Sequence, residues 1–106
     1  MRILHTMLRV GNMQRAIDFY TQVLGMQLLR MTERPTQNYD LAFLGYGSNP
    51  EHAEIELTFN YGVECYEHGS AFGHIAIGVT DVAATCAAVR QKTVVLGGAV
   101  TRDRVP

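Results

Sequence analysis

Hydrophobic and polar residues alternate without a break over residues 53–59, a pattern typical of a β-strand with one buried face. The apolar positions share one face of this strand: Ile55, Leu57 and Phe59. The opposite face carries two glutamates, and a carboxylate inside a protein is costly unless a positive group meets it. We expect Glu54 to lie near the strand edge and to be solvated, whereas Glu56 needs a partner from another part of the chain.

Two further strands offer such partners. Residues 2–10 predict a strand whose polar face carries His5, and residues 73–79 predict a strand in which His74 faces away from the apolar side chains. A single histidine on a strand is most often a structural residue that makes ordinary hydrogen bonds. Here, however, three strands each bring one side chain that can bind a metal to a polar face. Together they predict a concave metal-binding site, a metal cup, formed by His5, Glu56 and His74.

The segment after the first strand predicts an amphipathic helix followed by three strands. Asn12 can cap this helix and Gly25 can end it, and the apolar residues between them recur every three or four positions. The predicted buried stripe consists of Met13, Ile17, Tyr20 and Leu24. The three strands are predicted at residues 26–32, 39–46 and 53–59. The order of elements is therefore β-α-β-β-β.

The C-terminal part of the chain repeats the beginning of this unit. Residues 5–10 and residues 74–79 each run from a histidine through four residues to a valine. In both places two turn residues and then a predicted helix follow the valine. The second helix is predicted over residues 80–92, and a further strand is predicted to begin at residues 99–101.

These features predict an α+β fold of tandem β-α-β-β-β modules. Module one spans residues 1–59, residues 60–72 form a linker, and module two spans residues 73–106. Because the sequence ends at Pro106, we expect module two to be truncated, without its last two strands and without a residue equivalent to Glu56.

Charge and composition argue against several classes of function. The 106 residues carry a formal net charge of −1 with no run of like charges, so neither nucleic acid nor a membrane surface is an expected partner. The N-terminus lacks a signal-peptide pattern, and no apolar run is long enough to span a bilayer. Cys65 and Cys86 lack zinc-type spacing and are too few for a disulfide framework, so a reduced cytoplasm is the expected location.

Several short motifs follow one another along the chain. They lie at residues 5–10, 18–20, 24–26, 41–43, 55–60 and 73–76. Together they resemble lactoylglutathione lyase (glyoxalase I), in its short bacterial form within the vicinal-oxygen-chelate superfamily. The resemblance extends over essentially all 106 residues and implies a single glyoxalase-type domain. It also implies an activity in methylglyoxal detoxification: isomerisation of the hemithioacetal of methylglyoxal and glutathione to S-lactoylglutathione through an enediolate.

The resemblance further implies a homodimer with active sites at the subunit interface, where each subunit supplies two ligands to an octahedral metal ion. The implied ligands in this chain are His5, Glu56 and His74, and the family's fourth ligand, a glutamate that moves the proton, lies beyond Pro106. For the residues given, the resemblance implies Glu56 as the catalytic carboxylate. Ni²⁺ is the implied metal, with Co²⁺ or Zn²⁺ as alternatives.

Substrate contacts are implied residue by residue. Arg9 and Asn60 resemble the positions that grip the glutathione moiety. Three further residues resemble the wall around the small carbonyl-derived group: Met7, Leu41 and Phe43.

Two other functions remain open on these residues. An iron-dependent extradiol-type dioxygenase of the same superfamily uses two histidines and one glutamate, a count that the predicted cup satisfies. A non-catalytic protein that binds a small molecule in the same cup is the second alternative, although such relatives generally lack the metal residues.

Overall fold

The computed structural model of the chain describes residues 1–95. The chain divides into two compact units, residues 1–66 and residues 67–106, and each unit is described separately below. The predicted strand at residues 99–101 lies outside the described residues. No helix within the described part combines the length and apolar character that crossing a membrane requires.

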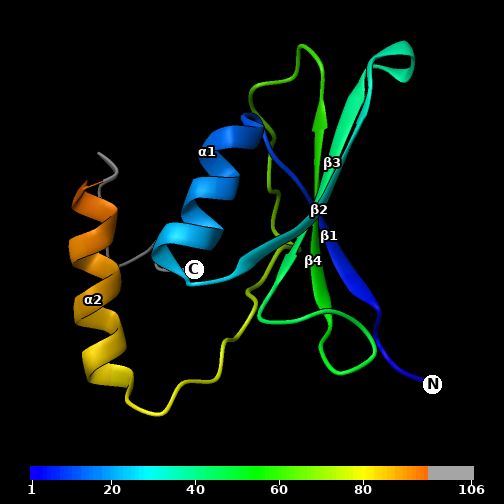
Figure 1. The fold of residues 1–106 in the computed structure, drawn as a ribbon. Helices are drawn as coiled ribbons and strands as arrows, with labels where there is room; N and C mark the ends of the chain where they lie inside the picture. The colour runs from blue at the N-terminus through cyan, green and yellow to red at the C-terminus, as the bar shows by residue number, and fades with distance from the viewer. Residues whose placement is uncertain (96–106) are drawn as a thin grey trace. The chain divides into compact units, whose positions relative to one another are not determined.

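The first unit is built on a four-stranded mixed sheet (Figure 1). Its strands are β1 (His5–Arg9), β2 (Gln27–Arg34), β3 (Tyr39–Gly45) and β4 (Glu54–Asn60). They lie in the spatial order β1-β4-β3-β2, with β1 parallel to β4 and the other neighbours antiparallel. The predicted order β-α-β-β-β is confirmed, and each predicted strand of this unit lies within a few residues of its predicted bounds.

The helix between β1 and β2 begins and ends where the sequence predicts. The Asn12 side chain accepts a hydrogen bond from the Arg15 N–H at 3.0 Å, which caps α1 (Met13–Asp18). Gly25 ends the helical segment with a φ of 73°, a left-handed conformation that favours glycine.

The last turn of this helical segment differs from the prediction. It is a π-helical turn, η1 (Phe19–Val23), in which the Leu24 N–H donates to the Phe19 carbonyl at 3.2 Å. This wider turn shifts which side chains face the core, so Val23 is buried and Leu24 is only half-buried. The simple three- and four-residue spacing could not predict this change of period.

Replacement of Asn12 by alanine is expected to lower the free energy of unfolding by about 1 kcal/mol, because an N–H of the first helical turn loses its acceptor. Asn12→Ser, which keeps a side-chain oxygen at the cap, is the matched control and should unfold close to the wild-type midpoint. Urea unfolding of the two variants measures the difference. Equal midpoints for the alanine and serine variants would show that the cap contributes nothing.

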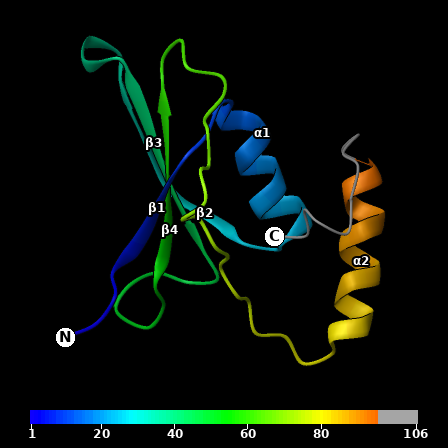
Figure 2. The same ribbon diagram turned by 180° about the vertical axis from the view of Figure 1, so that it is seen from behind.

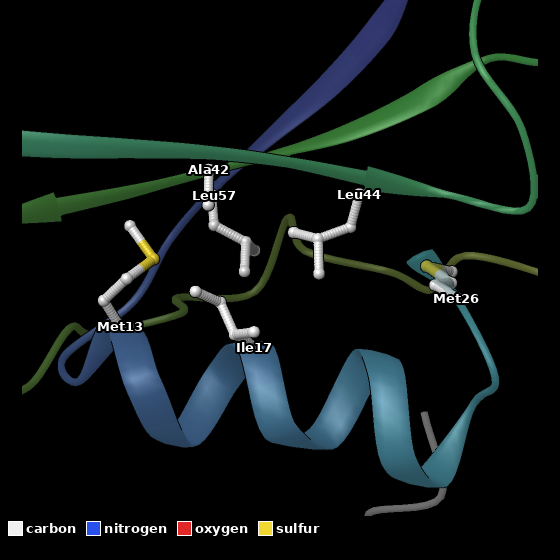
Figure 3. Close-up of a cluster of buried hydrophobic side chains, with 6 residues drawn as sticks. All are labelled: Met13, Ile17, Met26, Ala42, Leu44 and Leu57. Carbon is white, nitrogen blue, oxygen red and sulfur yellow. The ribbon is translucent and has the colours of Figure 1, made fainter. Parts of the chain in front are cut away.

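One face of the sheet packs against α1, and Figures 1 and 2 show this helix on the same side of the sheet from front and back. Figure 3 shows helix side chains directed at side chains of β3 and β4. Among the described residues, Leu44 and Leu57 are the largest side chains that are fully buried. The core cluster consists of Met13, Ile17, Met26, Ala42, Leu44 and Leu57. Burial of this apolar surface is the main stabilising contribution to the unit.

The second unit contains α2 (Val82–Val95). The Asp81 side chain accepts a hydrogen bond from the Ala84 N–H at 2.9 Å, so the predicted helix start is confirmed. The helix continues three residues beyond the predicted end at Lys92.

The prediction of a strand at residues 73–79 is wrong. The segment has no regular secondary structure, and its alternating apolar side chains are exposed. The physical reason lies in the hydrogen bonds of a strand, which need the backbone of a neighbouring strand. Among the described residues of this unit, the regular element is a helix, which offers no such backbone edge.

Candidate active site

The face of the sheet opposite α1 carries most of the sheet's polar residues. Paired residues of neighbouring strands point to the same side, and the register pairs Met7 with Glu56 and Phe43 with Glu56. Alternation along each strand then places one set on this open face: His5, Met7, Arg9, Arg30, Thr32, Arg34, Tyr39, Leu41, Phe43, Glu54, Glu56, Thr58 and Asn60. α1 packs against the other face, so no α-helix of residues 1–66 covers this one.

His5 and Glu56 lie together on the open face. The Nε2 atom of His5 is 3.8 Å from the Oε1 atom of Glu56, and both side chains are partly exposed, at 42% and 17%. This separation is too long for a direct hydrogen bond. Nitrogen and oxygen donors about 2.1 Å from one ion lie roughly 3 Å apart at a right angle and roughly 4.2 Å apart when opposite. The observed distance falls within that interval, so the two side chains fit a shared divalent cation.

Within residues 1–66 the candidate ligands form a pair. No third histidine, cysteine, aspartate or glutamate joins His5 and Glu56 in a metal-holding group there. His74 belongs to the second unit, where its side chain is exposed on a segment without regular structure. Its role as a ligand stays a prediction.

The five residues predicted to contact substrate all belong to the open face. Arg9 and Met7 lie on β1 and are exposed, while Leu41 and Phe43 lie on β3 and are partly buried. Asn60 ends β4, and its side-chain N–H group donates to the Tyr66 hydroxyl at 3.2 Å. Their contacts with a substrate stay predictions, but the sheet places all five on the side of His5 and Glu56.

Sequence reasoning missed an ion pair between Arg30 and Glu54 on this face. The expectation that Glu54 is solvated is wrong: only 3% of the residue is exposed. Its carboxylate accepts from the Arg30 guanidinium at 2.7 Å and from the Asn49 backbone N–H at 3.0 Å. Arg30 lies on β2 and Glu54 on β4, two strands apart in the sheet. Alternation placed Glu54 on the polar face of its strand, but nothing in the sequence indicated that Arg30 of β2 would reach it across β3.

The same partners shift the titration of Glu54. The hydrogen bond from Arg30, followed by that from the Asn49 N–H, holds the pKa of this carboxyl below its ordinary value of 4.5. Because the folded protein binds the proton less tightly than the unfolded chain does, the carboxylate stabilises the fold above the ordinary pKa. That contribution is lost as the pH falls through the lowered pKa.

We therefore expect the free energy of unfolding to fall more steeply between pH 6 and pH 3 in the wild type than in Glu54→Gln. Glu51→Gln, a change at an exposed position of the loop before β4, should keep the wild-type slope. Urea midpoints across this pH range measure both slopes. A Glu54→Gln slope equal to that of the wild type would exclude the contribution of this carboxylate.

Comparisons with known proteins agree with the fold. The family profile of the Glyoxalase/Bleomycin resistance protein/Dioxygenase superfamily matches residues 2–104. Lactoylglutathione lyase of Haemophilus influenzae is 60% identical over 106 residues, which are 100% of this chain and 76% of that protein.

Two solved structures of glyoxalase I share the same architecture. The enzyme of Leishmania major, described as trypanothione-dependent, gives a TM-score of 0.82 at 52% identity over 86% of this chain and 66% of that chain. The enzyme of Zea mays gives a TM-score of 0.83 at 43% identity over 86% of this chain and 32% of that chain. The chain thus belongs to the Glyoxalase/Bleomycin resistance protein/Dioxygenase superfamily and, within it, to the lactoylglutathione lyases.

Proposed function

We propose that the open face of the sheet is one half of a metal-dependent active site. It isomerises the hemithioacetal of methylglyoxal and glutathione to S-lactoylglutathione, the reaction of a carbon–sulfur lyase. The observation that carries the proposal is the 3.8 Å separation of the His5 imidazole and the Glu56 carboxylate on a partly exposed, helix-free face.

His5 and Glu56 are the residues that would hold the metal, with His74 as the proposed third ligand. An imidazole and a carboxylate suit a borderline divalent ion in octahedral coordination, and we favour Ni²⁺ over Co²⁺ or Zn²⁺. When bound, such an ion supplies positive charge where negative charge develops on the two oxygens of the substrate.

The remaining steps belong to side chains of this face. The Glu56 carboxylate moves a proton between the two adjacent carbons of the substrate. The Arg9 guanidinium binds a carboxylate of the glutathione moiety, and the Asn60 amide binds its polar backbone. Apolar side chains exclude water around the small carbonyl-derived group: Met7, Leu41 and Phe43.

We propose that a second copy of the chain completes the site. A pair of ligands is fewer than the three or four protein donors of most metal sites in enzymes, so further donors must come from elsewhere. A symmetric homodimer supplies each site with residues of both chains. Its mass in solution is twice that of the 11.8 kDa chain, which light scattering measures directly.

The assay is loss of the hemithioacetal in the presence of the full chain, first stripped of metal and then supplied with Ni²⁺. We expect turnover that depends on the added ion and saturates with it. Oxygen uptake with a catechol and Fe²⁺, without loss of hemithioacetal, would favour a dioxygenase instead. Tight ligand binding with neither activity would favour a binding protein.

A further inference from the structure

Arg30 reaches across the sheet in a way that its ion pair alone does not explain. β3 lies between β2 and β4, so the Arg30 side chain must pass over a residue of β3 to reach Glu54. That residue is Phe43: the guanidinium carbon lies 4.0 Å from the centre of its ring. A guanidinium over an aromatic face is held there by the negative charge of the ring face. Glu54 thus anchors Arg30, and Arg30 covers the Phe43 ring.

A second contact of the Phe43 ring is with a proposed metal ligand. The rings of Phe43 and His5 are 5.5 Å apart and meet edge to face at 85°, a favourable aromatic geometry. His5 lies on an edge strand and its side chain is 42% exposed, so few other groups restrain its imidazole. The ring of Phe43 is therefore a main determinant of where the imidazole points.

Glu54 is also close to His5 along the sheet. The parallel register pairs these two residues, so their side chains leave the same face from neighbouring positions. A Glu54 carboxylate without its arginine would be a second acceptor for the imidazole, in competition with Glu56. The ion pair at 2.7 Å turns that carboxylate toward β2 instead.

We propose that Arg30 and Glu54 are positioning residues for the metal site: they hold the Phe43 ring, and through it they orient the His5 imidazole toward Glu56. The proposal rests on the proposed function of His5 and Glu56 as metal ligands. Residues that orient a metal ligand without touching the ion commonly change metal affinity by about 10-fold to 100-fold when they are replaced.

Two variants of Arg30 test the proposal in the full chain. Arg30→Met removes the charge, and Arg30→Lys keeps the charge but lacks the planar group that lies over the ring. We expect Arg30→Met to weaken Ni²⁺ binding by roughly 10-fold to 100-fold and Arg30→Lys by about 3-fold to 10-fold, measured by calorimetry. Arg34→Met is the matched control, since Arg34 is exposed at the far end of the same strand and face, and it should bind as the wild type does.

A second readout needs no metal. In the metal-free chain, nuclear Overhauser effects between the ring protons of His5 and Phe43 report their contact. We expect these effects in the wild type and in Arg34→Met, and we expect them to weaken in both Arg30 variants. Arg30→Lys preserves the ion pair with Glu54, so it keeps the test decisive if Arg30→Met does not fold.

The two readouts separate this inference from the proposed function. Wild-type Ni²⁺ affinity together with an unchanged ring contact in either folded Arg30 variant overturns the positioning role and leaves the metal site standing. A wild-type chain that binds no Ni²⁺, but whose ring contact is lost in the Arg30 variants, refutes the metal site and supports the role of Arg30 in orienting His5.

Discussion

Glu56→Gln is expected to lower kcat/KM for the hemithioacetal by about 10²-fold to 10⁴-fold, because the amide can neither accept the substrate proton nor act as an anionic metal ligand. The change keeps the shape of the side chain on a half-buried strand position, so the fold should persist. Steady-state assays with Ni²⁺, combined with circular dichroism of the same preparation, measure activity and fold together.

The matched control for this prediction is Glu51→Gln. It removes one carboxylate charge at an exposed loop position before the same strand, and it should leave kcat/KM unchanged. Activity of Glu56→Gln within a factor of about two of the wild type would remove Glu56 from the catalytic machinery and with it the site proposed on this face.

Leu57→Ala is expected to lower the free energy of unfolding by about 2–5 kcal/mol, because it leaves a cavity beneath α1 at a fully buried position. Leu57 contributes to the core from β4, one of the two central strands, which also carries Glu56 on its other face. Loss of this packing therefore threatens the site as well as the fold. Urea unfolding at neutral pH measures the loss.

Leu28→Ala is the control for Leu57→Ala. Leu28 lies in the same sheet but is 44% exposed, and its truncation should cost less than about 1 kcal/mol. Equal losses for the two leucines would mean that the sheet face beneath α1 is not the stabilising core.

Local sequence signals predicted the first unit well. The alternation over residues 53–59 gave the strand and its two faces, and Asn12 and Gly25 gave the ends of the helix. These features depend on neighbours within a few residues, which a sequence displays directly. The π-helical turn before Leu24 was missed because its cause is a change in hydrogen-bond partner, not a change in the apolar pattern.

Contacts between distant segments were harder to predict. The proximity of His5 and Glu56 followed from placing both on polar strand faces, and the parallel pairing of β1 with β4 brings them together. The pairing of Arg30 with Glu54 depends on strand order, which alternation does not contain. A buried carboxylate at the start of a strand needs a cation, and that requirement was the one available signal for Glu54.

Residues 73–79 show that a regular alternating pattern does not by itself form a strand. Their alternating pattern is as regular as that of β1, yet the structure forms no strand there. A pattern reports which face a strand would bury, but the strand itself requires a partner backbone.

The most direct measurement is an anomalous difference map at the nickel absorption edge, from crystals of the full chain grown with Ni²⁺. One strong peak is predicted on the open sheet face, within about 2.0–2.3 Å of both His5 Nε2 and a carboxylate oxygen of Glu56. A peak held by other side chains, with the imidazole of His5 and the carboxylate of Glu56 left uncoordinated, would contradict the account.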